Sequence, residues 1–235
     1  MENQTLMMTG YNLYWILFFG ITVASWIVSS LLERRFKKYS EVKLSMTGKE
    51  VAEKMLRDNG LTDVKVTSTT GHLTDHYNPQ NKTVNLSESV YNEANVAAAA
   101  VAAHECGHAV QHAKAYAPLK MRSALVPVVS FSSKWVTWIL LIGMFVVESF
   151  PLLLEVGIGL FALTTLFSFI TLPVEVDASR RAVNWLEEYG VTDRENTALA
   201  SKALHSAAYT YVVAALSSLG TLIYYILVLV GRRSN

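Results

Sequence analysis

The chain has 235 residues, of which 51% are hydrophobic, and its mean hydropathy of +0.28 excludes an ordinary soluble domain, while 17% charged residues exclude a chain buried entirely in lipid. A net charge of +1 excludes the clustered basic excess that nucleic-acid binding requires. A single cysteine, Cys106, excludes an intramolecular disulfide and a multi-thiolate metal site, so any metal must be bound by histidine and carboxylate.

The first predicted element is a transmembrane helix over residues 11–32. This run is uncharged and long enough to cross a hydrocarbon core about 30 Å thick, and a basic cluster begins at Arg34. A signal peptide is the alternative. Residues 1–10 contain no lysine or arginine and the apolar run is longer than a signal peptide requires, so the sequence favours a membrane anchor.

Residues 33–128 form the main polar segment and are expected to fold outside the lipid. Thr47 and Glu50 form a capping box, which predicts a helix that ends at Asn59-Gly60. Three stretches have the composition of short strands and predict a small sheet: residues 64–67, 73–77 and 83–86. An alanine-rich helix is then expected from Glu93 to about Ala115, before Pro118.

An HExxH pattern lies in this last helix, at His104, Glu105 and His108. The histidines are four residues apart, about 40° around a helix, so both imidazoles can face one metal ion. Glu105 is placed to hydrogen-bond a water molecule at the metal and to act as general base. A chance match of three residues is the competing explanation. Cys106 points away from the metal face and is expected to pack against a neighbouring helix.

Three further apolar runs predict membrane spans. Residues 129–147 and 156–172 are separated by a breaker that ends in Pro151, so residues 129–172 are predicted to form a transmembrane hairpin. Residues 207–230 are uncharged and predict a fourth span.

The distribution of basic residues predicts the topology. Of 20 lysines and arginines, 14 lie in residues 33–134, four in residues 173–206 and two at the C-terminus. Four alternating spans put 18 of them on one face, which the positive-inside rule makes cytoplasmic. We therefore expect a multi-pass plasma-membrane protein with both termini outside and the active site in the cytoplasm, although the C-terminal arginine pair opposes this arrangement.

A zinc hydrolase needs a third protein ligand and an open coordination position. His112 lies more than about 10 Å along the helix from His104, too far to bind the same ion, and is expected to support the site or face solvent. Glu175 is the better candidate, because residues 173–206 follow the third span on the cytoplasmic side.

A helix after the third span would place Ser179 on the same face as Glu175. Asp177 would point away from this face, and we expect it to meet solvent or Arg181.

Residues 71–112 and 172–186 resemble the bacterial membrane-bound neutral zinc metallopeptidases of the YugP type, and the similarity extends over nearly the whole chain. The sequence is more distantly similar to the HtpX and CAAX-prenyl proteases. The resemblance implies one Zn²⁺ held by His104, His108 and Glu175, with Glu105 as general base. Ser179 stands where these distant relatives carry aspartate, and its hydroxyl could accept the imidazole N–H.

Several further residues are candidates for supporting a ligand or stabilising the transition state. Ser179 is one, His76 and Tyr77 lie before the HExxH helix, and Tyr209 and Tyr211 lie near the start of the last span. A surface histidine and an interfacial tyrosine are the plainer interpretations of these positions, and the sequence does not decide among them.

The predicted fold is mainly α, with about four transmembrane helices and a cytoplasmic α+β, zincin-like catalytic portion that contains a small β-sheet and the HExxH helix. The predicted function of residues 33–128 together with Glu175 is zinc-dependent hydrolysis of peptide bonds. The predicted substrates are peptides or proteins, and membrane proteins are among them. The alternative is a membrane adaptor without catalytic activity, in which the metal site is structural or vestigial.

Overall fold

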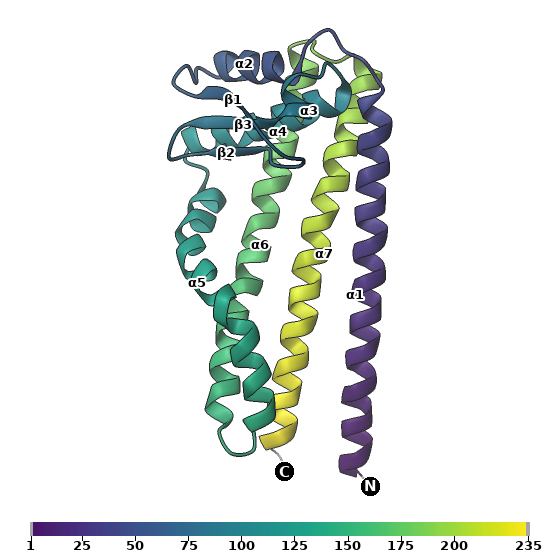
Figure 1. Cartoon of the computed structure of the whole chain (residues 1–235), viewed down its shortest axis with the longest axis vertical. Coiled ribbons are helices and arrows are strands. Elements are labelled where there is room, and N and C mark those ends of the chain that lie inside the picture. Colours follow the sequence, from purple (N-terminus) through teal and green to yellow (C-terminus); the bar gives the residue numbers. More distant parts are fainter. Residues whose placement is uncertain (1, 234–235) are drawn as a thin grey trace. The chain divides into compact units, whose positions relative to one another are not determined.

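The computed structural model describes residues 2–233, with the side chains of residues 15–231. The fold is mainly helical, as predicted, and within the described residues it contains seven helices and one small sheet (Figure 1). The helices and strands, in chain order, are α1 (Glu2–Ser40), α2 (Gly48–Asp58), β1 (Lys65–Thr69), β2 (His76–Asn78), β3 (Thr83–Ser87), α3 (Glu88–Tyr91), α4 (Val96–Ala113), α5 (Ala117–Val146), α6 (Pro151–Glu188) and α7 (Arg194–Arg233).

The chain divides into two compact units. The first, which we call the helical unit, comprises the described parts of residues 1–27, 121–172 and 211–235. The second, the site unit, comprises residues 28–120 and 173–210. The helices α1, α5, α6 and α7 each contribute residues to both units.

Four helices in the described part of the chain are long and apolar enough to cross a membrane, namely α1, α5, α6 and α7. They contain the four predicted apolar runs almost completely, and each helix is longer than its run because polar residues at its ends are also good helix formers. The hairpin breaker separates α5 from α6, which begins at Pro151. The side chains of the terminal arginine pair lie outside the described ones.

The helical unit packs α5 against α6 through small residues. A Cβ atom on Gly143 would lie 2.9 Å from the backbone of Leu154, so the two helices approach closely there. Leu140 and Leu154 are buried in the apolar cluster beside this contact. Such a close approach is specific to one register of the apolar parts of α5 and α6.

In the site unit, α2 has the predicted ends. The Thr47 side chain accepts a hydrogen bond from the Glu50 backbone N–H, and the Glu50 carboxylate accepts one from the Thr47 N–H at 2.7 Å. The helix stops at Asn59, and Gly60 follows with a φ of +72°. Its apolar face, which includes Val51 and Met55, is buried in the core of this unit.

The sheet has the order β1-β3-β2, with β1 parallel and β2 antiparallel to β3. Val84 and Leu86 of the central strand are fully buried. The strand predicted over residues 73–77 begins only at His76, because Leu73 has a φ of +58° and is exposed in a turn. The edge strand β2 consequently starts directly beside the HExxH helix.

Helix α4 is shorter than predicted at both ends. It begins at Val96 because the side chain of Asn95 caps it by accepting a hydrogen bond from the Ala98 N–H at 2.9 Å. It ends at Ala113. Pro118 lies in the first turn of the next helix, a position that proline favours, so it begins α5 as well as limiting α4. Between these ends α4 is buried almost all round, which is why alanine dominates its sequence.

The capping box of α2 is open to a direct test. Thr47→Ala removes the acceptor for the Glu50 backbone N–H and should lower the free energy of unfolding by about 1 kcal/mol. Denaturant unfolding of the purified protein in detergent, followed by circular dichroism, measures this change. Thr70→Ala, on an exposed loop, is the control. Equal stability of the two variants would contradict the capping role.

Candidate metal centre

Two histidines of α4 form the base of the candidate site. His104 and His108 lie one helical turn apart, with ring centroids separated by 4.8 Å and ring planes at 83°. Both side chains are largely buried, with 15% and 11% of their surface exposed. The helix therefore presents two imidazoles to the same small space.

Glu175 of α6 completes a group of three. Its Oε2 atom lies 3.3 Å from His104 Nε2 and 3.6 Å from His108 Nε2, and the residue is 3% exposed. The three ligand atoms all lie within 4.8 Å of one another. In the described part of the chain, this is the group of histidines and carboxylates that could hold a metal ion.

A close approach of α4 and α6 brings these residues together. A Cβ atom on Gly107 would lie 2.6 Å from the Ala178 carbonyl oxygen, well inside van der Waals contact. Gly107 stands between the two histidines in sequence, and Ala178 is one turn after Glu175. The absence of a side chain at position 107 thus allows α6 to lie close enough to α4 for the Glu175 carboxylate to reach the two histidines.

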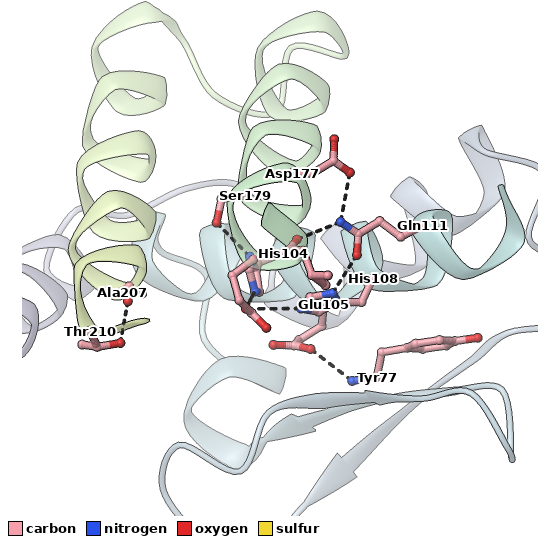
Figure 2. Close-up of polar contacts among 11 residues, drawn as sticks. Tyr77, His104, Glu105, His108, Gln111, Asp177, Ser179, Ala207 and Thr210 are labelled. Atoms are coloured by element: carbon pink, nitrogen blue, oxygen red, sulfur yellow. Dashed lines mark hydrogen bonds and ion pairs between the residues drawn. The ribbon is translucent and has the colours of Figure 1, made fainter. Parts of the chain in front are cut away.

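The remaining ring nitrogens have polar partners, which Figure 2 shows as dashed lines. His104 Nδ1 lies 3.1 Å from Ser179 Oγ, and His108 Nδ1 lies 3.0 Å from Gln111 Oε1. Both Nε2 atoms consequently face Glu175. Burial alone lowers the pKa of His108, but the hydrogen bond with Glu175 and the charges of Glu105 and Glu175 outweigh it, so the pKa is raised.

Glu105 is held by the edge of the sheet. Its carboxylate accepts a hydrogen bond of 3.0 Å from the backbone N–H of Tyr77 in β2 (Figure 2). The residue is 9% exposed and lies one position after His104. The contact fixes the carboxylate beside the two histidines without using any other charged group.

The other predicted candidates differ in their exposure and in the contacts that their side chains make. The Tyr77 hydroxyl pairs with the exposed His112 at 3.0 Å, and burial raises the pKa of Tyr77. His76 is exposed and contacts the Thr74 carbonyl oxygen at 2.8 Å. Tyr209 is exposed on α7, and Tyr211 belongs to the helical unit. Any role of these side chains in a reaction stays a prediction.

The solvent exposure expected for Asp177 is wrong, although the expected contact with Arg181 is present. Asp177 is 4% exposed, and its carboxylate accepts hydrogen bonds from Arg181 at 2.6 Å, from Arg180, and from Gln111 at 2.9 Å. Asp177 does point in a different direction from Glu175 around the α6 axis. Asp177 is nevertheless buried because α4 packs over both side chains.

Gln111 is a member of the site that the sequence analysis did not identify. It lies three residues after His108 on α4 and is fully buried. Glutamine at this spacing is unremarkable in a helix, so the only signal was its place within reach of a candidate ligand.

Cys106 lies away from the metal group, as expected. Its thiol is fully buried and contacts the Ala52 carbonyl oxygen of α2 at 3.6 Å. Burial raises the pKa of the thiol well above its usual value. Cys106 is therefore a packing residue.

Comparisons with known proteins cover almost the entire chain. A family profile described as "Putative neutral zinc metallopeptidase" matches residues 14–230. A curated protein of Bacillus subtilis (strain 168), named "Putative membrane protease YugP", is 39% identical over 226 residues, which span 94% of this chain and 100% of that protein. No solved structure matches the chain.

Gly107→Ala tests whether the helix approach sets the metal site. The added methyl group would collide with the Ala178 carbonyl group, so α6 must shift, and metal affinity should fall at least about tenfold. Competition with a chelator of known affinity measures this loss. Gly159→Ala is the matched control, because a Cβ atom there meets nothing within 4 Å. Equal metal affinity of the two variants would contradict the constraint.

Proposed function

Since this chain belongs to the neutral zinc metallopeptidase family, we propose that it is a membrane-anchored peptidase that binds one Zn²⁺ through His104, His108 and Glu175. Its substrates are peptides or proteins, and membrane proteins are among them. The observation that carries this proposal is the convergence of the two Nε2 atoms and the Glu175 carboxylate within 4.8 Å, on two helices far apart in sequence.

The donor set fits zinc. Two imidazoles and one carboxylate are a ligand combination of catalytic zinc sites, whereas structural sites usually close all four positions with protein. The group in the described part of the chain has three members and no fourth histidine, cysteine or carboxylate. It therefore leaves a coordination position for substrate or water.

Zinc in this site would polarise the scissile carbonyl and lower the pKa of water to about 7. Glu105 supplies the matching base, because a carboxylate beside the two histidines can take a proton from the attacking water. The same carboxylate can then deliver that proton to the amine leaving group. The Tyr77 N–H holds Glu105 Oε2 in place at 3.0 Å, which restricts the carboxylate to one orientation.

We also propose that the site faces the cytoplasm. Of the 20 basic residues, 18 lie in the segments that four spans put on one side, which the positive-inside rule makes cytoplasmic. Glu175 lies in one of these segments, three positions after the apolar run that ends at residue 172. This places the reaction at the membrane surface and both chain ends on the opposite side.

A non-catalytic adaptor is the less favoured function. A purely structural metal site needs no additional carboxylate beside its ligands. Here Glu105 is buried next to the metal group at the cost of desolvation, and the sheet edge provides a donor for it. A carboxylate in this position can act as a base in hydrolysis, whereas docking of a partner protein does not require it.

Two substitutions separate binding from chemistry. Glu105→Gln should retain one equivalent of zinc and lose hydrolysis of casein or peptides by about 10²- to 10⁴-fold, because the base is gone. Glu175→Ala should lose the zinc itself. Metal analysis and peptide hydrolysis on the detergent-purified protein measure both effects.

Glu88→Gln provides the matched control, because Glu88 is exposed in the short helix α3 and should keep both zinc and activity. Retention of zinc by Glu175→Ala would refute the third ligand. A wild-type protein that binds zinc but cleaves nothing in a broad peptide library would favour the adaptor.

A further inference from the structure

We propose that Gln111 and Asp177 are positioning residues that fix the tautomer and orientation of the His108 ring as a metal ligand. The inference rests on the proposed function in one respect, which is that His108 binds the metal. It assigns a role to two buried side chains that neither touch the metal position nor belong to the HExxH pattern.

The orientation of the Gln111 amide follows from its partners. Its Nε2 atom lies 2.8 Å from the Val174 carbonyl oxygen and 2.9 Å from Asp177 Oδ2. The Val174 carbonyl oxygen can only accept a hydrogen bond, and the Asp177 carboxylate also accepts hydrogen bonds from Arg180 and Arg181. The NH₂ group of Gln111 must therefore face both partners. The amide oxygen is therefore the atom on the side of His108.

This orientation determines where His108 carries its proton. An amide oxygen only accepts hydrogen bonds, so the Nδ1 atom that lies 3.0 Å from Gln111 Oε1 must be the donor. In the neutral ring the Nε2 atom then has a free lone pair, and it faces Glu175 Oε2 at 3.6 Å. Gln111 thus selects the form of His108 that can bind a metal through Nε2.

The neighbouring histidine lacks such a constraint. His104 Nδ1 lies 3.1 Å from the Ser179 hydroxyl, and a hydroxyl can either donate or accept. Ser179 therefore permits both neutral forms of His104. Of the two Nδ1 contacts, only that of His108 determines which nitrogen carries the proton in the neutral ring.

Asp177 keeps the amide from rotating. Its carboxylate is buried, and Arg180 and Arg181 balance its charge by donating hydrogen bonds to it, so it remains an acceptor for Gln111. Rotation of the amide by 180° would point its oxygen at the Asp177 carboxylate and the Val174 carbonyl, which are both electron-rich. Figure 2 shows Asp177, Gln111 and His108 connected in this order.

Zinc affinity of the full-length protein in detergent tests the proposal by chelator competition. Gln111→Met keeps the length of the side chain but removes the acceptor, and should weaken zinc binding about 10- to 100-fold. Gln80→Met, the same change on an exposed turn, should bind zinc like the wild type. In the cobalt-substituted protein, Gln111→Met should also alter the visible absorption spectrum, which a loss of packing alone would leave unchanged.

Asp177→Asn gives a second, independent measurement. It should weaken zinc binding less than Gln111→Met does, and the double variant should bind zinc no more weakly than Gln111→Met alone, because Asp177 acts through Gln111. Additive losses would overturn the role of Asp177. If metal-free Gln111→Met does not fold, unchanged zinc affinity in Asp177→Asn overturns the proposal and weaker affinity supports it.

Failure of this inference is distinguishable from failure of the proposed function. A wild-type protein that binds no zinc refutes the metal site itself. A wild-type protein that binds zinc, together with Gln111→Met that binds it within twofold and has the same cobalt spectrum, refutes only the role of Gln111.

Discussion

The candidate metal centre depends on the close contact between α4 and α6 at Gly107. Because Gly107 has no side chain, the Ala178 carbonyl group can occupy the space that a Cβ atom would fill. The same contact between the helices brings Glu175 to the two histidines. Protein interiors transmit such steric limits because they are close-packed. The geometry of the three ligand atoms is therefore a consequence of helix packing, and the alanine-rich surface of α4 serves this packing as much as it serves helix formation.

Around this contact, polar groups are buried in mutually dependent pairs. Gln111, Asp177 and Glu105 would each cost free energy as isolated buried groups, but each has a partner from another element: α6, α4 and β2 respectively. Satisfying these groups requires α4, α6 and the sheet to be in place together. The network accordingly ties the shape of the site to the complete fold of the site unit.

The helices α1, α5, α6 and α7 are long and apolar enough to cross a membrane, and each also contributes residues to the site unit. The first part of α6 lies in the helical unit, while the residues after Leu172 include the candidate ligand Glu175, the carboxylate that holds Gln111, and the carbonyl groups that α4 contacts. Glu175 lies on a regular helix, which positions a side chain more precisely than a loop does.

The long helices and α2 could be predicted from the sequence because their signals are local: apolar run length for the four candidate spans, the Thr47 capping box for α2, and the spacing of His104 and His108 on one helix. The short helix α3 and the ends of β2 and α4 could not. The sequence also nominated Glu175, through residue type and chain position. The burial of Asp177, the hydrogen bonds by which Gln111 joins it to His108, and the contact of Glu105 with the sheet edge depend on packing between elements. Helical periodicity fixes the direction of a side chain around its own axis, whereas burial depends on which other helix covers that direction. Burial therefore depends on contacts between residues far apart in the sequence, such as Gly107 and Ala178, and a local sequence pattern does not predict such contacts.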